Sequence, residues 1–176
     1  MKHRSHRITL GFAAGALLLW RAQPTLLTFL AGIVLMTAGA TVRFLSAGTL
    51  VKFEGVTDTG IYAHTRNPLY AGSFLIGLGA CIMGGDPLFL GAFLVVFPLY
   101  YWRVIRREER YLDRRYGDAY QRYVAAVPRI VPRRFDLHTV FEHSAPFLAV
   151  KNRELKTVWG ILAVWALLAV KMAIMN

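Results

Sequence analysis

The sequence predicts an all-α fold, a polytopic membrane helical bundle of about five transmembrane helices in hairpins, with further helices on the cytoplasmic side. Hydrophobic residues make up 56% of the 176-residue chain, and the mean hydropathy is +0.42. A soluble domain of this length is usually less apolar. The apolar residues gather in long runs, several of which approach the roughly 20 residues that cross the hydrocarbon core of a bilayer. Most cationic residues lie between these runs, as they do in membrane proteins with cytoplasmic loops.

Five apolar runs are predicted to form the transmembrane helices. They cover roughly residues 8–20, 24–45, 68–83, 87–102 and 158–174. The first run has only about two thirds of the spanning length, so it must tilt, extend into its basic flank or insert in part. Residues 21–24 end in proline, and residues 84–87 contain both glycine and proline, which favours a tight turn before a new helix. The first four helices are therefore expected to form two hairpins.

The net charge of +11 comes from 21 Lys and Arg residues against 10 Asp and Glu residues. Its distribution favours cytoplasmic loops and membrane-surface helices, so we expect membrane lipids and no nucleic acid as partners. The bias of Lys and Arg places the N-terminus and residues 46–67 and 103–156 on the cytoplasmic side. Arg21 and Lys171 are the exceptions to this charge rule.

Several kinds of site find no support in the sequence. Cys81 is the only cysteine and lies in an apolar run, which excludes an intrachain disulfide and a cysteine-based metal site. The chain has no His-Glu-x-x-His spacing and no Gly-x-Ser-x-Gly motif, so we predict neither a metal centre nor that type of serine nucleophile. Gly77-Leu78-Gly79 follows no predicted strand and lacks the third glycine of a dinucleotide fingerprint.

Small residues recur at helical spacing within the apolar runs. Four pairs are separated by three residues: Gly11 and Gly15, Thr28 and Gly32, Ser73 and Gly77, and Ala80 and Gly84. Such pairs let helix backbones approach closely where no hydrophobic effect drives association. We therefore expect these pairs to mark helix packing seams.

The most unusual stretch is Gly60-Ile-Tyr-Ala-His-Thr-Arg-Asn-Pro-Leu-Tyr-Ala-Gly72, where the third apolar run begins. A helix start explains Asn67 and Pro68, because Asn is a favoured N-cap and Pro fits the first helical turn. Tyr62 and Tyr70 lie near the same helix end, whose free N–H groups attract a carboxylate or a phosphate. Their rings either face an adenine or a sulfonium cation or belong to an interfacial aromatic belt.

The fourth run is predicted to continue as a helix into the cytoplasm. One face carries Tyr101, Ile105, Glu108, Leu112 and Tyr116, and the opposite face carries Arg103, Arg106, Arg107, Arg110 and Arg114. Glu108 thus shares a face with apolar residues, where a carboxylate is costly unless it is paired or holds a ligand. It either pairs with Arg66 or Arg107 or accepts a hydrogen bond from a ribose hydroxyl or an ammonium group.

These two clusters resemble the isoprenylcysteine carboxyl methyltransferase and phospholipid methyltransferase superfamily of integral-membrane enzymes. The first block of that superfamily, Gly-x-Tyr followed by Arg-His-Pro-x-Tyr-x-Gly, is matched by Gly60, Tyr62, Arg66, Pro68, Tyr70 and Gly72. The second block, a Glu-Glu pair followed by Leu, an aromatic residue and Gly, then Tyr-x-x-Tyr and Val-Pro, is matched by Glu108, Glu109, Leu112, Tyr116, Gly117, Tyr120, Tyr123, Val127 and Pro128. The resemblance covers roughly residues 54–132.

The resemblance implies an enzyme that transfers a methyl group from S-adenosylmethionine to a lipophilic or amphiphilic acceptor, which reaches the site laterally from the bilayer. By position, the cofactor pocket on the cytoplasmic side would be lined by Tyr62, Asn67, Pro68, Leu69, Tyr70 and Glu108. The single domain, residues 1–176, would comprise an N-terminal hairpin (8–45), a cofactor-binding core (54–132), a cytoplasmic connector (133–157) and a C-terminal transmembrane helix (158–174).

Two positions depart from the pattern of the superfamily. Asn67 stands where His is usual, so a role that needs an imidazolium is lost while hydrogen bonding remains. Val104 stands where the prenylcysteine enzymes carry an Arg associated with the acceptor carboxylate. The adjacent Arg103 is the one candidate catalytic residue, although on the helical wheel it points away from Glu108. This departure argues against a carboxylate acceptor and leaves an amine, a thiol or another nucleophile open.

Two other functions fit parts of the sequence. Some membrane sterol reductases resemble the same superfamily, so an NADPH-dependent membrane reductase is one alternative. A non-catalytic adaptor that binds anionic lipids through the basic helix face is another. Binding of S-adenosylmethionine that depends on Tyr70 and Glu108 distinguishes a methyltransferase from both.

Overall fold

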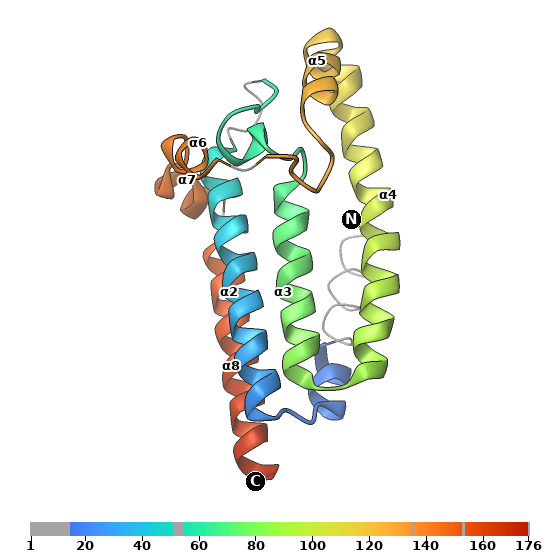
Figure 1. Cartoon of the computed structure of the whole chain (residues 1–176), viewed down its shortest axis with the longest axis vertical. Coiled ribbons are helices and arrows are strands. Elements are labelled where there is room, and N and C mark those ends of the chain that lie inside the picture. Colours follow the sequence, from blue (N-terminus) through green and yellow to red (C-terminus); the bar gives the residue numbers. More distant parts are fainter. Residues whose placement is uncertain (1–14, 51–54, 135, 153, 176) are drawn as a thin grey trace.

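The computed structural model describes residues 15–50, 55–134, 136–152 and 154–175. Its helices are α2 (Leu26–Thr49), the 3₁₀ helix η1 (Gly60–Ala63), α3 (Pro68–Gly84), α4 (Pro87–Tyr116), α5 (Asp118–Ala126), α6 (Leu137–Glu142), α7 (Pro146–Lys151) and α8 (Leu155–Met175). Residues 15–21 are helical as well, and no β-strand occurs in the described ranges. Figure 1 shows α2, α3 and α4 side by side with α8 along α2, whereas η1, α5, α6 and α7 gather at one end. The predicted all-α fold is confirmed.

Three helices, α2, α4 and α8, are long and apolar enough to cross a membrane, and α3 is a shorter apolar helix of 17 residues. These four helices correspond to the runs predicted after residue 23, whereas the first predicted span, 8–20, lies mostly outside the described residues. α4 has 30 residues, and a helix of that length is about 45 Å long. Because the hydrocarbon core is only about 30 Å thick, the arginine-rich end of α4 extends beyond it.

The turn between α3 and α4 contacts the segment before α2 at the other end of the bundle. Gln23 N–H donates to Gly84 O at 2.7 Å. Gly85 has a φ of 68°, a left-handed conformation that favours glycine at a helix end. Asp86 then accepts hydrogen bonds from two backbone N–H groups in the first turn of α4 and so caps that helix. The predicted turn at 84–87 is therefore present.

The two cations that break the charge rule lie at this end, and both have local partners. Arg21 forms an ion pair with Asp86. Lys171 Nζ donates to the carbonyl oxygens of Leu19 and Trp20, at 2.6 and 2.8 Å. These carbonyls belong to the last turn of the first helix, where a cation is favourable. Local pairing and helix capping thus explain both exceptions.

α2 and α3 pack backbone against backbone through two glycines on each helix. A Cβ atom added at Gly39 would lie 2.6 Å from the carbonyl oxygen of Gly72. One added at Gly79 would lie 2.9 Å from the carbonyl oxygen of Gly32. Only glycine permits so close an approach of two helices.

The predicted packing pairs agree with this arrangement only in part. Gly32 lies in the α2–α3 seam, and a Cβ at Gly84 would lie 3.0 Å from the Leu18 side chain. Gly77 faces α4 instead, because a Cβ there would lie 2.5 Å from the Phe93 ring. The seam glycines are seven residues apart on each helix rather than four, so the expected spacing missed three of them.

The connector that the sequence left without an assigned structure forms α6 and α7 against the end of α2. Ala145 N–H donates to Gly48 O at 3.0 Å. Asn152 Nδ2 donates to two carbonyl oxygens at the end of α2, at 2.8 and 3.2 Å. These carbonyls have no partner within a helix, so the connector satisfies them.

Candidate functional site

The start of the loop before α3 is fixed by a glycine and by burial. Gly60 has a φ of 58°, and a Cβ there would lie 2.9 Å from the Thr49 side chain. Ile61 and Tyr62, which follow in η1, are buried and pack with Val140 of α6. This loop is therefore set in place by both α2 and the connector.

The next residues of the loop are held by the segment that follows α5. Arg66 N–H donates to Pro128 O at 2.9 Å, and Thr65 Oγ1 donates to Ile130 O at 2.8 Å. Thr65 and Ile130 are 65 residues apart in the sequence. The segments that carry the two motif blocks are thus joined through main-chain carbonyls.

Asn67 belongs to the same junction. Its Nδ2 donates to Arg129 O at 3.1 Å, and its side chain makes no capping hydrogen bond to α3. Asn67 thus stands at the predicted N-cap position of α3, but its side-chain oxygen makes no capping hydrogen bond; the side chain is instead tied to the neighbouring segment through its nitrogen. The Asn67 carbonyl still accepts from the N–H groups of Tyr70 and Ala71, and Pro68 stands at the first position of α3.

The two adjacent glutamates of α4 have different partners. Glu108 is exposed and accepts a hydrogen bond from Tyr70 O–H at 2.7 Å. The side chain of Glu109 is only 12% exposed and forms ion pairs with Arg66 at 3.2 Å and Arg129 at 2.8 Å. The suggested pairing of Glu108 with Arg66 is wrong, because one residue turns a helix by about 100° and this step brings Glu109 to the loop.

Tyr62 lies buried beside the Tyr70–Glu108 hydrogen bond. Its carbonyl accepts from Tyr123 O–H at 2.8 Å. Burial raises the pKa of the Tyr62 hydroxyl, and Tyr123 and Glu108 raise it further. The hydroxyl is therefore neutral at physiological pH and can donate a hydrogen bond. Tyr70 and Arg43 also lie within electrostatic range of this hydroxyl.

The remaining predicted site residues do not all lie near this cluster of Tyr62, Tyr70 and Glu108. Pro68 is buried and Leu69 is half-buried, and both begin α3 next to Tyr70. Arg103, by contrast, is exposed on α4, on the face that the sequence predicts to point away from Glu108. Its catalytic role stays a prediction.

A column of aromatic rings runs from Tyr70 along the seam between α3 and α4. It consists of Tyr70 and Phe74 on α3 and Phe93, Phe97 and Tyr101 on α4. The ring centroids of Tyr70 and Tyr101 are 5.2 Å apart, those of Tyr101 and Phe97 are 4.1 Å apart, and those of Phe97 and Phe93 are 5.0 Å apart. This aromatic column connects Tyr70 to the apolar part of the bundle.

A family profile described as "Phospholipid methyltransferase" matches residues 27–119, more than half of the chain. The chain belongs to the phospholipid methyltransferase family. The range that matches this family contains α2, α3, α4 and the start of α5, and with them the Tyr70–Glu108 hydrogen bond.

Curated relatives of this phospholipid methyltransferase family member carry the name of one enzyme. The "Protein-S-isoprenylcysteine O-methyltransferase" of Schizosaccharomyces pombe is 30% identical over 104 residues, which cover 59% of this chain and 44% of that protein. The B and A forms of that enzyme in Arabidopsis thaliana are 30% and 29% identical over 98 residues, or 56% of this chain and 50% of each protein. The chain thus spans about half the length of the curated relatives it matches, and no solved structure matches it.

Three residues that hold the site of this phospholipid methyltransferase family member were not singled out for that role from the sequence. Glu109 and Arg129 join α4 to the loop, and Arg43 on α2 contacts α3. A cation within an apolar run, such as Arg43, is a readable signal, because a charge at that depth requires a partner. Arg129 offered no such signal, since it lies in a loop that also carries Arg133 and Arg134.

Proposed function

We propose that this chain is an integral-membrane methyltransferase that transfers a methyl group from S-adenosylmethionine to a lipophilic or amphiphilic acceptor. Membership of the phospholipid methyltransferase family supports methyl transfer. The observation that carries the proposal is the 2.7 Å hydrogen bond from Tyr70 to Glu108, because it joins two separate motif blocks at one point. The Lys and Arg bias of the chain supports a cytoplasmic position for this point and for the N-terminus.

The residues at the start of α3 suit S-adenosylmethionine chemically. The Asn67 side chain makes no capping hydrogen bond to α3, so the positive end of the helix dipole would favour the cofactor's carboxylate there. Glu108 is an exposed acceptor for the ammonium group or a ribose hydroxyl. The two tyrosine rings of the cluster suit the sulfonium or the adenine. Pro68 and Leu69 complete this surface.

In this mechanism the chain aligns the reactants and excludes water. S-Adenosylmethionine supplies an electrophilic methyl group when bound, so the reaction depends on alignment more than on a strong base. Tyr62 contributes a neutral hydroxyl donor at a buried position. Tyr70 orients the Glu108 carboxylate through its hydrogen bond. The aromatic column shields this region from water on the membrane side.

The acceptor approaches along the aromatic column from the bilayer. The rings present an apolar surface that continues from the α3–α4 seam to Tyr70, and an apolar chain packs well on such a surface. The names of the curated relatives, which specify S-isoprenylcysteine, support an acceptor with a lipophilic chain. The catalytic role predicted for Arg103 is tested by Arg103→Gln: reduced turnover with an unchanged Kd for S-adenosylmethionine would support it, and unchanged turnover would contradict it.

Thermal unfolding of the purified chain with and without S-adenosylmethionine tests the proposed function. A ligand at about 100 times its Kd stabilises the folded state by about 2.7 kcal/mol. We expect this stabilisation in the wild-type chain and in Arg106→Gln, whose exposed side chain lies on the cationic face of α4. It should disappear in Tyr70→Phe and Glu108→Gln, which lose the hydrogen bond between the two blocks.

The same assay separates the alternatives. Stabilisation by NADPH in place of S-adenosylmethionine would contradict the proposal and favour a reductase. A chain stabilised by neither cofactor, with lipid binding unchanged in the Tyr70 and Glu108 variants, would instead favour a lipid-binding adaptor. Mass spectrometry of lipid extracts incubated with the chain and the cofactor then identifies the acceptor by the added methyl group.

A further inference from the structure

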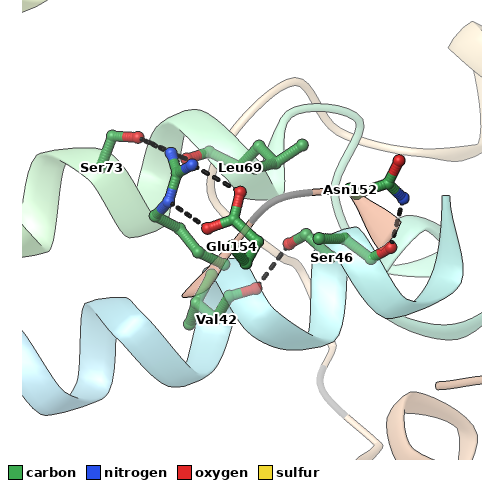
Figure 2. A network of polar contacts seen from close by, with 8 residues as sticks. Val42, Ser46, Leu69, Ser73, Asn152 and Glu154 are labelled. Atoms are coloured by element: carbon green, nitrogen blue, oxygen red, sulfur yellow. Dashed lines mark hydrogen bonds and ion pairs between the residues drawn. The ribbon is translucent and has the colours of Figure 1, made fainter. Parts of the chain in front are cut away.

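An arginine on α2 joins three parts of the chain at the end of the bundle that carries the cluster. Arg43 Nε and Nη2 donate to the two carboxylate oxygens of Glu154, at 3.0 and 2.7 Å. Its Nη1 donates to Ser73 Oγ and, at 3.5 Å, to the carbonyl oxygen of Leu69. Figure 2 shows Glu154, Ser73 and Leu69 around this guanidinium. Arg43 therefore connects α2 and the first turns of α3 to the residue that precedes α8.

The Arg43–Glu154 pair is largely enclosed, with side-chain exposures of 21% and 9%. A bidentate arginine–carboxylate pair fixes orientation as well as distance, because both partners are planar. The stem of Arg43 also lies directly against α3, since a Cβ at Gly72 would lie 2.7 Å from Arg43 Cγ. Contact and hydrogen bonding together determine how the first turns of α3 rest on α2.

The connector that leads to Glu154 also supports Tyr62 from another side. Val140 of α6 is fully buried and packs with Ile61 and Tyr62. The connector therefore contacts Tyr62 of the cluster through Val140, and it reaches α3 indirectly, because Glu154 holds the arginine that bonds Leu69 and Ser73. It lies outside the residues 27–119 that match the family profile.

We propose that Arg43 and Glu154 are positioning residues of the candidate cofactor site. By holding the first turns of α3, the pair sets the rotation of that helix and directs Tyr70 O–H toward Glu108. Neither member of the pair touches the reacting atoms. The identity of the cofactor in this site rests on the proposed function. The claim that the pair positions α3 does not depend on it.

The experiment compares Glu154→Gln with Asp86→Asn. Asp86 is a matched control, because it pairs with Arg21 at the opposite end of the same bundle. We expect Glu154→Gln to accelerate hydrogen exchange of the backbone amides at residues 69–73. It should also raise the Kd for S-adenosylmethionine about 10-fold, because displacement of positioned groups by a fraction of an ångström weakens binding and turnover strongly. Asp86→Asn should leave both quantities as they are in the wild-type chain.

Arg43→Lys is the second variant, and it covers the case in which Glu154→Gln does not fold. Lysine keeps the charge but cannot form the bidentate fork. The exchange rate at residues 69–73 and the Kd for S-adenosylmethionine should therefore both rise, but less than in Glu154→Gln. Unchanged exchange and an unchanged Kd would overturn the positioning role, as would an equal loss of affinity in Asp86→Asn. A wild-type chain that binds no S-adenosylmethionine contradicts the proposed function alone, because hydrogen exchange still decides whether the pair positions α3.

Discussion

The two seams that flank α3 are built in opposite ways. Toward α2, backbones meet through Gly32, Gly39, Gly72 and Gly79. Toward α4, rings fill the space: Phe74 lies 5.6 Å from Phe93 and 5.5 Å from Phe97 between ring centroids. Contact between backbones admits no added atom, whereas the contacts of a ring seam are made by side chains, which can change rotamer. We therefore infer that α3 is fixed on the α2 side and adjustable on the α4 side.

This difference teaches how one helix can serve two substrates. The fixed side gives Tyr70 and the helix N-terminus a defined position, as a small polar cofactor requires. The adjustable side is where we propose that an apolar chain approaches, and an apolar chain needs space more than fixed hydrogen bonds. α4 also has a polar contact near each end: Glu109 pairs with Arg66 of the loop before α3, and Asp86 pairs with Arg21 of the first helix.

The largest expected effect comes from forcing the glycine seam apart. In Gly39→Leu the new side chain meets the Gly72 carbonyl oxygen, which lies 2.6 Å from the ideal Cβ position. Overpacking typically costs about 1–3 kcal/mol, and backbone cannot yield as a side chain does, so we expect a loss of about 3 kcal/mol or more. Thermal unfolding in detergent measures it. Gly160→Leu on α8 is the control, since nothing lies within 4 Å of its Cβ position, and equal stability of the two variants would contradict the close approach.

The next effect concerns the polar attachment of α4 to the loop before α3. Glu109→Gln removes the partner of Arg66, whose side chain is only 11% exposed. An enclosed charge left without its partner is costly, so the free energy of unfolding should fall by about 2 kcal/mol. Glu108→Gln should change stability by less than about 0.5 kcal/mol, because Glu108 is exposed. Chemical denaturation of both variants without ligand measures the two losses of unfolding free energy. A larger loss in Glu108→Gln would mean that Glu108, and not Glu109, is the structural glutamate.

The bilayer made the spans predictable from the sequence. A spanning helix must satisfy its own backbone and reach across the hydrocarbon, so the length and hydropathy of each run nearly determine its structure. Local signals also located the turn before α4, where Asp86 caps the helix and Pro87 opens it. The first run is different, since most of it lies outside the described residues.

Partners from distant segments were not predictable in the same way. A helical wheel placed Glu108 on the inner face and Glu109 among cations, yet Glu109 is the enclosed residue. The wheel carries no information on where the chain goes after Pro128, and that segment brings Arg129 to Glu109 and to the Asn67 amide. The local preference of Asn correctly located the N-cap of α3, but the tertiary partner of its side chain was not predictable from local signals.

The glycine seam could have been predicted from the sequence, but from glycines seven residues apart rather than four. Gly32 and Gly39 on α2 and Gly72 and Gly79 on α3 are each seven residues apart, which is close to two helical turns. Two small residues so placed lie on one face of a helix, as residues four apart do. Pairing Gly39 with Gly72 and Gly32 with Gly79 also requires that α2 and α3 run antiparallel, which follows from their order across the membrane.

A smaller effect is expected in the aromatic seam. Phe97→Ala removes a ring from the middle of the aromatic column, but this side chain is only half-buried and lipid or detergent can fill the space. We therefore expect a loss of about 1 kcal/mol, well below the 3–5 kcal/mol of a buried phenylalanine. Acceptor KM should rise while the Kd for S-adenosylmethionine stays constant. Phe147→Ala on α7, where the ring is 74% exposed, is the matched control. A loss of cofactor affinity in Phe97→Ala would show that the aromatic seam is not independent of the glycine seam between α2 and α3.

The smallest effect is a pH dependence at the turn where α3 passes into α4. The hydrogen bond from Arg21 holds the pKa of Asp86 below its ordinary value, and the backbone N–H of Phe89 contributes. Because the folded state binds this proton less tightly than the unfolded state, the carboxylate stabilises the fold above its ordinary pKa of about 3.9. That contribution is lost as the pH falls through the lowered pKa. The thermal midpoints of wild type and Asp86→Asn should therefore differ at neutral pH and converge below about pH 4. A difference that stayed constant across this range would mean that the ionised Asp86 carboxylate does not stabilise this turn.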